Sequence, residues 1–563
     1  MRPAAARTAD APGPTTRADG PLTAGGGPGP AAARPAHGAP SRRFLARATL
    51  LSAALSIAGA VLGLGRDQAL AHLFGAGAET DAFLVAWTVP ELAATLLIED
   101  GLAFVLVPAF SAALALRASG KGTPDPVRAL VAASLPKLCL AFAATAAALV
   151  AGAPLVVSVL APGLRDVSLA VACTRLTATC VLSFGLAGYC SAALRAHRAY
   201  LAPGAIYIAY NLAIITSMFV LGAHWGVRAA ALGVALGGCL MVAVQAPSLA
   251  RRLAGRPGRR AVAYDGDGGV PLAPGLVCAV LLFALCRQSQ VLIERYLASG
   301  LPAGAISHLN YAQKVAQLPM SLASMVCVVT FPVVAQAIAE GDTRRARDRV
   351  ERDLVLMGCL VLLGAAVVVA CAPQIVQLLF QRGAFTAQDT AATASVMRVY
   401  ATGLLGQTLV GALVRSYFAA GRTTWFPLGA MGVGALTTVA VGTWAVGPWG
   451  ARGIAAANAA GITVTALLLL HGLGPGSVPV RVRRLLAELA RPLCAAVCAT
   501  AAGLFCAGLF ASPAAAVAAC CLCVTTVFLA LAWLLDAACA RSLLLPAAQY
   551  LRNSVTRKAG HGR

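Results

Sequence analysis

The chain has 563 residues, of which 59% are hydrophobic and only 12% are charged. Because a typical soluble domain has about 25% charged residues, this composition excludes an ordinary soluble protein. The formal net charge is +23, but the basic residues are spread among loops without interleaved aromatic residues, so no nucleic-acid partner is expected.

The first 42 residues are mostly Ala, Pro and Gly with scattered Arg, and they hold few large apolar side chains. Such a segment buries too little apolar surface to fold alone. It also lacks the apolar core of a signal peptide. We expect residues 1–42 to form a disordered cytoplasmic tail, which is where cytoplasmic partner proteins would bind.

From residue 43 onward, apolar stretches follow one another with brief polar interruptions. With roughly 20 residues needed per crossing, the sequence predicts an all-α, polytopic membrane protein with about fourteen membrane-spanning helices. They centre on residues 44–64, 80–111, 127–160, 167–194, 200–223, 227–249, 272–298, 306–339, 350–380, 386–419, 424–446, 453–471, 485–510 and 514–540. Several stretches exceed the length needed, and Pro90, Pro136 and Pro319 mark where helices are expected to break.

A faint internal repeat relates the second and eighth stretches. Residues 76–78 and 303–305 both read Ala-Gly-Ala, and each precedes a long apolar stretch with an internal proline. Chance is the alternative in so alanine-rich a chain, but such repeats are typical of transporters whose two halves enclose a cavity. We predict two pseudo-symmetric six-helix lobes at 43–250 and 271–472, two further helices at 484–541, and a basic cytoplasmic tail at 542–563.

The arginines predict an orientation. Alternate loops carry basic clusters at residues 117–128, 195–198, 251–260, 344–352 and 481–484, whereas the intervening loops carry few basic residues. The positive-inside rule places the basic loops in the cytoplasm. We therefore expect a multi-pass protein of the inner (plasma) membrane with both termini cytoplasmic.

The motifs of common enzymes are missing. The sequence contains no GxxxxGK[ST], HExxH or GxSxG pattern, and its seven histidines are scattered. Six of the seventeen cysteines lie inside apolar stretches and are interpreted as packing residues, namely Cys139, Cys173, Cys278, Cys359, Cys371 and Cys506. The cluster Cys520, Cys521 and Cys523 has no second pair at metal-binding spacing. We expect a transporter and not an enzyme, with no metal and no cofactor.

Ionisable residues at membrane depth are the candidates for function, because a charge in hydrocarbon is tolerated mainly where it faces a cavity or a partner. The cavity candidates are Arg66, Lys314, Asp81, Glu99, Arg287 and Arg295. Arg66 closes the first predicted span and Lys314 begins the eighth, so each lobe would bring one cation to a shared cavity, which suits a diphosphate. The alternative is a structural role, and Glu294 with Arg295 could be a local pair at a helix end.

Several spaced motifs carry a family resemblance. Residues 63–67 (Gly-Leu-Gly-Arg-Asp), 74–77 (Phe-Gly-Ala-Gly) and 80–83 (Thr-Asp-Ala-Phe), followed by Glu99, resemble the amino-terminal signature of the MurJ/MviN family of lipid II flippases. Residues 297–300, 309–312 and 379–386 resemble later family motifs. The resemblance implies the fold of the multidrug/oligosaccharidyl-lipid/polysaccharide exporter superfamily. It also implies alternating-access transport of a lipid II-like, undecaprenyl-diphosphate peptidoglycan precursor to the outer leaflet, with that substrate and membrane lipids as partners.

The chain departs from the family at charged positions. The family commonly has arginine where this chain has Ala60 and Ala94, and usually arginine at Lys314, whose ammonium lacks the bidentate fork. A divergent paralogue that exports another lipid-linked precursor and a non-transporting membrane scaffold therefore stay open as alternatives. A drug/cation antiporter would need a membrane carboxylate, for which the second lobe offers little beyond Glu294.

Overall fold

The computed structural model describes residues 42–99, 101–118, 125–254, 274–323, 342–419, 425–473 and 480–535. Every regular element in these ranges is a helix. Residues 50–563 group into one compact unit by their contacts, and the description concerns that unit.

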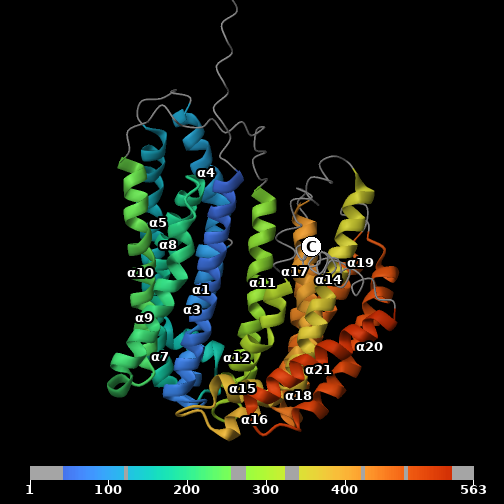
Figure 1. The fold of residues 1–563 in the computed structure, drawn as a ribbon. Coiled ribbons are helices and arrows are strands. Elements are labelled where there is room, and N and C mark those ends of the chain that lie inside the picture. Colours follow the sequence, from blue (N-terminus) through green and yellow to red (C-terminus); the bar gives the residue numbers. More distant parts are fainter. Residues whose placement is uncertain are drawn as a thin grey trace, which may run out of the picture. The chain divides into compact units, whose positions relative to one another are not determined.

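The first half of the unit begins with a long helix and continues with helices that are broken within their predicted spans (Figure 1). The elements are α1 (Arg42–Phe74), α2 (Ala78–Ala86), α3 (Thr88–Ala93), the π-helix η1 (Ala94–Glu99), α4 (Gly101–Ala118), α5 (Pro126–Ala151), α6 (Ala153–Leu160), α7 (Val167–Ala178), α8 (Cys180–Ala196), α9 (Leu201–Trp225) and α10 (Arg228–Ala254). Helices α9 and α10 pack side by side along their lengths, and α8 packs against both α4 and α10.

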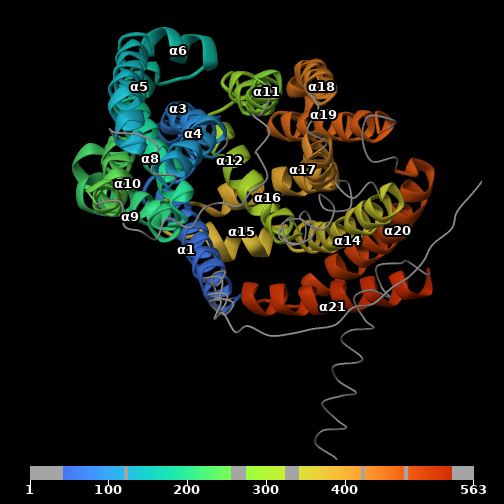
Figure 2. The same cartoon turned by 90° about the horizontal axis from the view of Figure 1, so that it is seen from above.

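The second half repeats this pattern of broken helices. It comprises α11 (Pro274–Ala298), α12 (Ala305–Ala316), α14 (Thr343–Ala370), α15 (Ala372–Phe380), α16 (Ala387–Thr402), α17 (Leu404–Ala419), α18 (Phe426–Trp449) and α19 (Ala451–His471). The last two helices, α20 (Val482–Ala507) and α21 (Pro513–Leu534), pack against each other and against α14, as Figure 2 shows from above.

The prediction of an all-α, multi-pass membrane protein is confirmed. Ten helical stretches in the described ranges are long and apolar enough to cross a membrane. Each of the fourteen predicted spans overlaps one or more described helices, although residues 324–341 of the eighth lie outside the described ranges. The count of about fourteen crossings and the lobe boundaries stay predictions.

Two of the three expected helix breaks occur where the prolines predict them. Pro90 lies in α3, just after the break at Trp87, and α12 ends three residues before Pro319. The break expected at Pro136 is wrong, because this residue lies inside the continuous helix α5. That stretch breaks instead at Gly152, where Pro154 in the first turn of α6 lacks the N–H that would continue the hydrogen-bond ladder.

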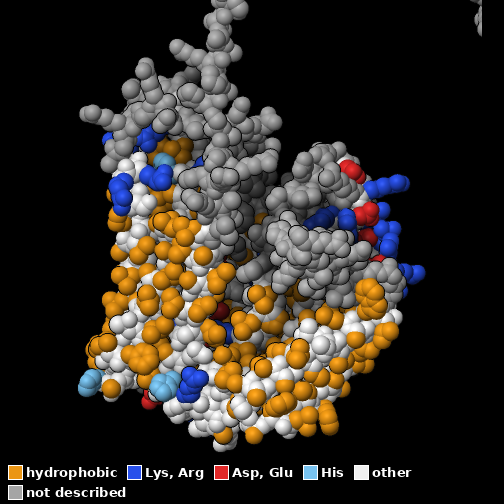
Figure 3. Space-filling view, in the orientation of Figure 1, with side chains coloured by type: hydrophobic (Ala, Val, Ile, Leu, Met, Phe, Trp, Pro, Cys, Tyr) orange, Lys and Arg blue, Asp and Glu red, His pale blue; other side chains and the backbone are white. Residues whose placement is uncertain are grey.

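Charged side chains gather at the helix ends, whereas the middle of the face in Figure 3 is covered by hydrophobic side chains. The cluster at 344–352 occupies the first turns of α14 and not a loop as predicted, since α14 begins at Thr343. Arg481, the N-cap of α20, pairs with Asp348 and Glu351 of α14 at 3.2 Å each. The hydrogen bond to Glu351 raises the pKa of the Arg481 guanidinium.

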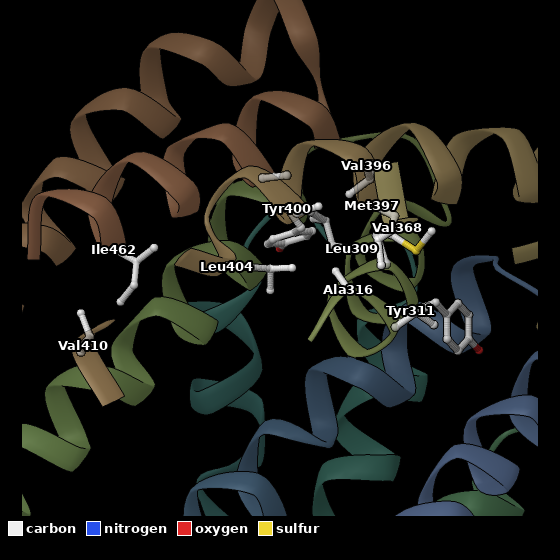
Figure 4. Packing of buried hydrophobic residues seen from close by; sticks show 14 of the residues in the cluster. Leu309, Tyr311, Ala316, Val368, Val396, Met397, Tyr400, Leu404, Val410 and Ile462 are labelled. Atoms are coloured by element: carbon white, nitrogen blue, oxygen red, sulfur yellow. The ribbon is translucent and has the colours of Figure 1, made fainter. Parts of the chain in front are cut away.

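Buried apolar side chains fix the orientation of α12 (Figure 4). Tyr311 packs against Phe380 and Phe385 with ring centroids 5.0 and 5.8 Å apart, and all three are almost fully buried. Close packing of this kind holds helices together where lipid removes the usual hydrophobic drive. As a result, Ser307 and Lys314 of α12 reach partners in the first half of the chain.

Candidate functional site

Arg66 lies inside α1 and does not close the first helix as predicted, because α1 continues to Phe74. Its guanidinium pairs with the neighbouring Asp67, with the Arg66 NH2 atom 2.8 Å from Asp67 Oδ1. A second donor, the Arg66 NH1 atom, reaches Asn211 Oδ1 of α9 at 3.2 Å. These contacts hold the cation at a defined place in the first half of the unit.

Lys314 brings a second cation to the same carboxylate from α12. Its Nζ lies 3.1 Å from Asp67 Oδ2. Asp67 therefore bridges two cations, one from each half of the unit. The Trp87 ring covers both cations, with its centroid 4.3 Å from Arg66 Cζ and 5.7 Å from Lys314 Nζ. The structure thus brings together Arg66 and Lys314, the two residues that the sequence favoured most.

Asp67 offsets one of the two positive charges of the bridge, because both Arg66 and Lys314 pair with the same carboxylate. Buried charges are tolerated when they are paired in this way. The adjoining cavity measures only about 10 Å³, which is room for one water molecule at most. In this conformation the site is filled by its own side chains.

Asp81 lies outside this cluster, in a second contact between the two halves. Its carboxylate accepts hydrogen bonds from the Gly304 and Ser307 amides at 2.7 and 2.8 Å and from the Ser307 hydroxyl at 2.6 Å. Asp81 therefore caps the N-terminus of α12, where exposed amides and the helix dipole favour a negative charge. Gly304 is required there because its φ is +94° and an added Cβ would lie 2.7 Å from the Ala76 carbonyl oxygen.

The other predicted cavity residues have separate surroundings. Glu99 accepts a hydrogen bond from the Tyr207 hydroxyl at 2.9 Å, and Arg287 is exposed on α11. Arg295 is buried and donates to the Ile306 carbonyl and to Asn310 Oδ1, each at 3.4 Å. Their role in binding substrate stays a prediction.

The suggested local pair of Glu294 and Arg295 is not what the structure shows. Glu294 Oε2 accepts a hydrogen bond from Tyr400 at 2.7 Å, and Glu294 Oε1 accepts another from Asn458. Both carboxylate oxygens are therefore directed to α16 and α19 and not to the adjacent guanidinium. Among the described residues, no group of three or more His, Cys, Asp or Glu side chains is placed to hold a metal ion.

Three parts of the site were not predicted from the sequence. Asp67 stood there only as a member of the motif at residues 63–67, and not as the bridge between the cations. Asn211 could have been found, since it is a single amide in the otherwise apolar stretch 200–223. Nothing in the sequence identifies Trp87 as a site residue, because an aromatic residue in an apolar span is ordinarily a packing residue.

Comparisons with known proteins agree with this fold. The family model of lipid II flippase MurJ matches residues 70–523. Lipid II flippase MurJ of Burkholderia cenocepacia is 28% identical over 386 residues, which cover 67% of this chain and 73% of that protein. The probable lipid II flippase MurJ of Bdellovibrio bacteriovorus is 27% identical over 465 residues, which cover 79% and 85% of the two chains.

Two solved structures share the fold. Lipid II flippase MurJ in an inward closed conformation matches with a TM-score of 0.66 and 19% identity, covering 86% of this chain and 98% of that one. An inward-facing multidrug resistance transporter of the MATE family matches with a TM-score of 0.59 and 14% identity, covering 78% and 98%. Since the family model spans most of the membrane-embedded chain and both sequence relatives carry the same description, this protein belongs to the MurJ family of lipid II flippases.

Proposed function

We propose that this chain moves an undecaprenyl-diphosphate-linked peptidoglycan precursor from the cytoplasmic to the outer leaflet by alternating access. The observation that carries the proposal is the bridge at Asp67, where Arg66 and Lys314 from the two halves meet one carboxylate. Carboxylate and phosphate oxygens accept the same charge-assisted hydrogen bonds. A substrate phosphate can therefore take the place of Asp67 between the two cations.

Substrate entry requires this bridge to open. The site now has about 10 Å³ of free space, so Lys314 has to withdraw from Asp67 before a diphosphate fits. The Arg66 guanidinium then offers two parallel N–H donors to the phosphate, and Lys314 closes on it from the other half. When the head group leaves, Asp67 recovers both cations and resets the site.

The Asp81 cap serves as the outer gate in this mechanism. Its three hydrogen bonds join α2 to the start of α12, and they have to break for release on that side. The basic residues at the ends of α8, α10, α14 and α20 support placing the opposite side, and both termini, in the cytoplasm. An inside-negative potential would draw an uncompensated cation inward at about 2.3 kcal/mol per charge per 100 mV.

The charge balance favours a second candidate, the export of another lipid-linked precursor with a less negative head group. Asp67 already offsets one of the two positive charges of the bridge, and Ala60 and Ala94 supply none. A head group with a single negative charge would then bind with less electrostatic mismatch than a diphosphate.

Binding measured by native mass spectrometry separates the candidates. Purified chain is titrated with a polyprenyl-diphosphate-linked and a polyprenyl-monophosphate-linked sugar. We expect Arg66→Ala and Lys314→Ala each to weaken diphosphate binding by about tenfold to a hundredfold, since a hydrogen bond to a charged group contributes about 1.5–3 kcal/mol. Lys137→Ala, which removes an exposed cation of α5 outside the site, is the matched control. Preference for the monophosphate would favour the other precursor, and binding of neither would favour a scaffold.

A further inference from the structure

An apolar groove of about 940 Å³ lies between the two halves of the unit, away from the Asp67 bridge. One wall consists of Thr88–Leu97 residues of α3 and η1 with residues of α5, α6 and α8, and the other consists of residues of α11 and α18. In Figure 2, α5 and α6 lie at the upper left, and α11 and α18 lie to the right of them. We propose that this groove holds an acyl chain of an outer-leaflet phospholipid, as a bound lipid wedged between the two halves.

Two contacts between the halves flank the groove along α11. Gln288 Nε2 of α11 donates to Thr95 Oγ1 of η1 at 3.1 Å, one helical turn before the lining residue Leu292. At the other end, the Gly163 amide donates to Ser299 Oγ at 3.2 Å. Only glycine fits at 163, because a Cβ there would lie 2.8 Å from the Gly300 backbone. Along α11, the lining residues 292–297 therefore lie between two hydrogen bonds that join the two walls.

The chemistry of the walls selects a hydrocarbon occupant. Except for three threonines and Tyr296, the lining residues are aliphatic or Phe, and the α3, α5, α8 and α18 walls belong to helical stretches that qualify as membrane spans. At that depth the groove is surrounded by lipid acyl chains and not by water. The volume of the groove lies within the range of about 300–1,000 Å³ that is usual for small-molecule sites.

The dimensions of the groove favour an acyl chain over a polyprenyl chain. The lining residues of α3 and η1 run from Thr88 to Leu97, which at about 1.5 Å per residue is about 14 Å, or half of the roughly 30 Å hydrocarbon core. A phospholipid tail occupies one leaflet in the same way. Tyr296, which is 55% exposed near the end of α11, and Arg165, which is exposed in the loop after α6, suit a rim beside the head group.

The lipid would be linked to transport because each half supplies one wall. Any reorientation of the halves that breaks the Gln288 and Gly163 contacts changes the width of the groove. An acyl chain in place therefore stabilises the conformation described here, and its departure accompanies the opposite one.

Photolabelling tests the proposal. The full chain in nanodiscs is exposed to phosphatidylglycerol that carries a diazirine midway along one acyl chain, and the labelled peptides are mapped by mass spectrometry. We expect residues 88–97 and 292–297 to be labelled above the lipid-exposed surface around Leu436, which is 70% exposed on α18. Val439→Trp and Thr145→Trp, which fill the groove from opposite walls, should reduce this labelling to the surface level.

The controls are Leu436→Trp and Leu140→Trp, on the same two helices but exposed to lipid and outside the groove. They should leave the labelling unchanged. Groove labelling no stronger than surface labelling, or equal labelling in the filled and control variants, would overturn the proposal. So would labelling by a polyprenyl-phosphate diazirine probe in place of the phospholipid. None of these readouts depends on transport, so they test the lipid site independently of the proposed function.

Discussion

The outer contact at Asp81 gives a sharp prediction for Asp81→Asn. The carboxylate accepts three hydrogen bonds from Gly304 and Ser307, whereas an Asn side chain keeps one acceptor oxygen and turns an NH2 group toward an amide donor. Losing one hydrogen bond to a charged group and the favourable charge at the helix N-terminus removes about 2–4 kcal/mol in total. Because each 1.4 kcal/mol is tenfold, the closed outer contact becomes about thirtyfold to several hundredfold less favoured relative to the open one.

Distances between two spin labels, measured by double electron–electron resonance, report whether the outer contact is closed or open. Gly77 and Gly300 suit unnatural spin-labelled residues, because a Cβ at either position meets no atom within 4 Å. Asp81→Asn should add a population at longer distances, and Ser307→Ala, which removes only the hydroxyl contact, should add a smaller one. A distance distribution identical to that of the unmodified chain would refute the reasoning that this cap holds the two halves together.

Three further predictions concern charge and orientation. In cells depleted of their own lipid II flippase, the unmodified chain should rescue growth poorly, and Ala60→Arg with Ala94→Arg should improve rescue; strong rescue by the unmodified chain would show that the present cations suffice. Lys314→Arg should keep or improve function in the same assay, whereas Lys314→Ala should abolish it at normal membrane abundance, and equal growth of both variants would remove Lys314 from the site. Membrane-impermeant labelling of a residue introduced at exposed Arg344 should occur only after permeabilisation, and labelling of intact cells would reverse the orientation.

The architecture followed from sequence where local composition decides it. Runs of apolar residues of spanning length gave the helices, and the overlap of every predicted span with described helices shows that this signal is strong. Helix ends were less well determined. Arg66 was placed at the end of a span because a charge usually ends an apolar run, but pairing with Asp67 lets α1 carry it through the membrane.

The pairing of residues far apart in the chain could not be derived from local patterns. Asp81 and Ser307 are 226 residues apart, and Lys314 and Asp67 are 247 apart. Which side chains meet depends on how helices far apart in the chain pack against each other, and composition carries no information on that. Arg66 and Lys314 were still found, because an unneutralised charge at membrane depth predicts a partner even when the partner itself is unknown.

The transfer of a lipid-linked diphosphate between leaflets by the purified chain tests the central claim most directly. Proteoliposomes containing the unmodified chain, Arg66→Ala, Lys314→Ala or the control Lys137→Ala are loaded with a fluorescent polyprenyl-diphosphate-linked sugar, and a membrane-impermeant quencher reports its leaflet over time. We expect transfer by the unmodified chain and by Lys137→Ala, and transfer at the rate of empty liposomes by the other two variants. Equal transfer by all four proteins, or transfer by none, would contradict it.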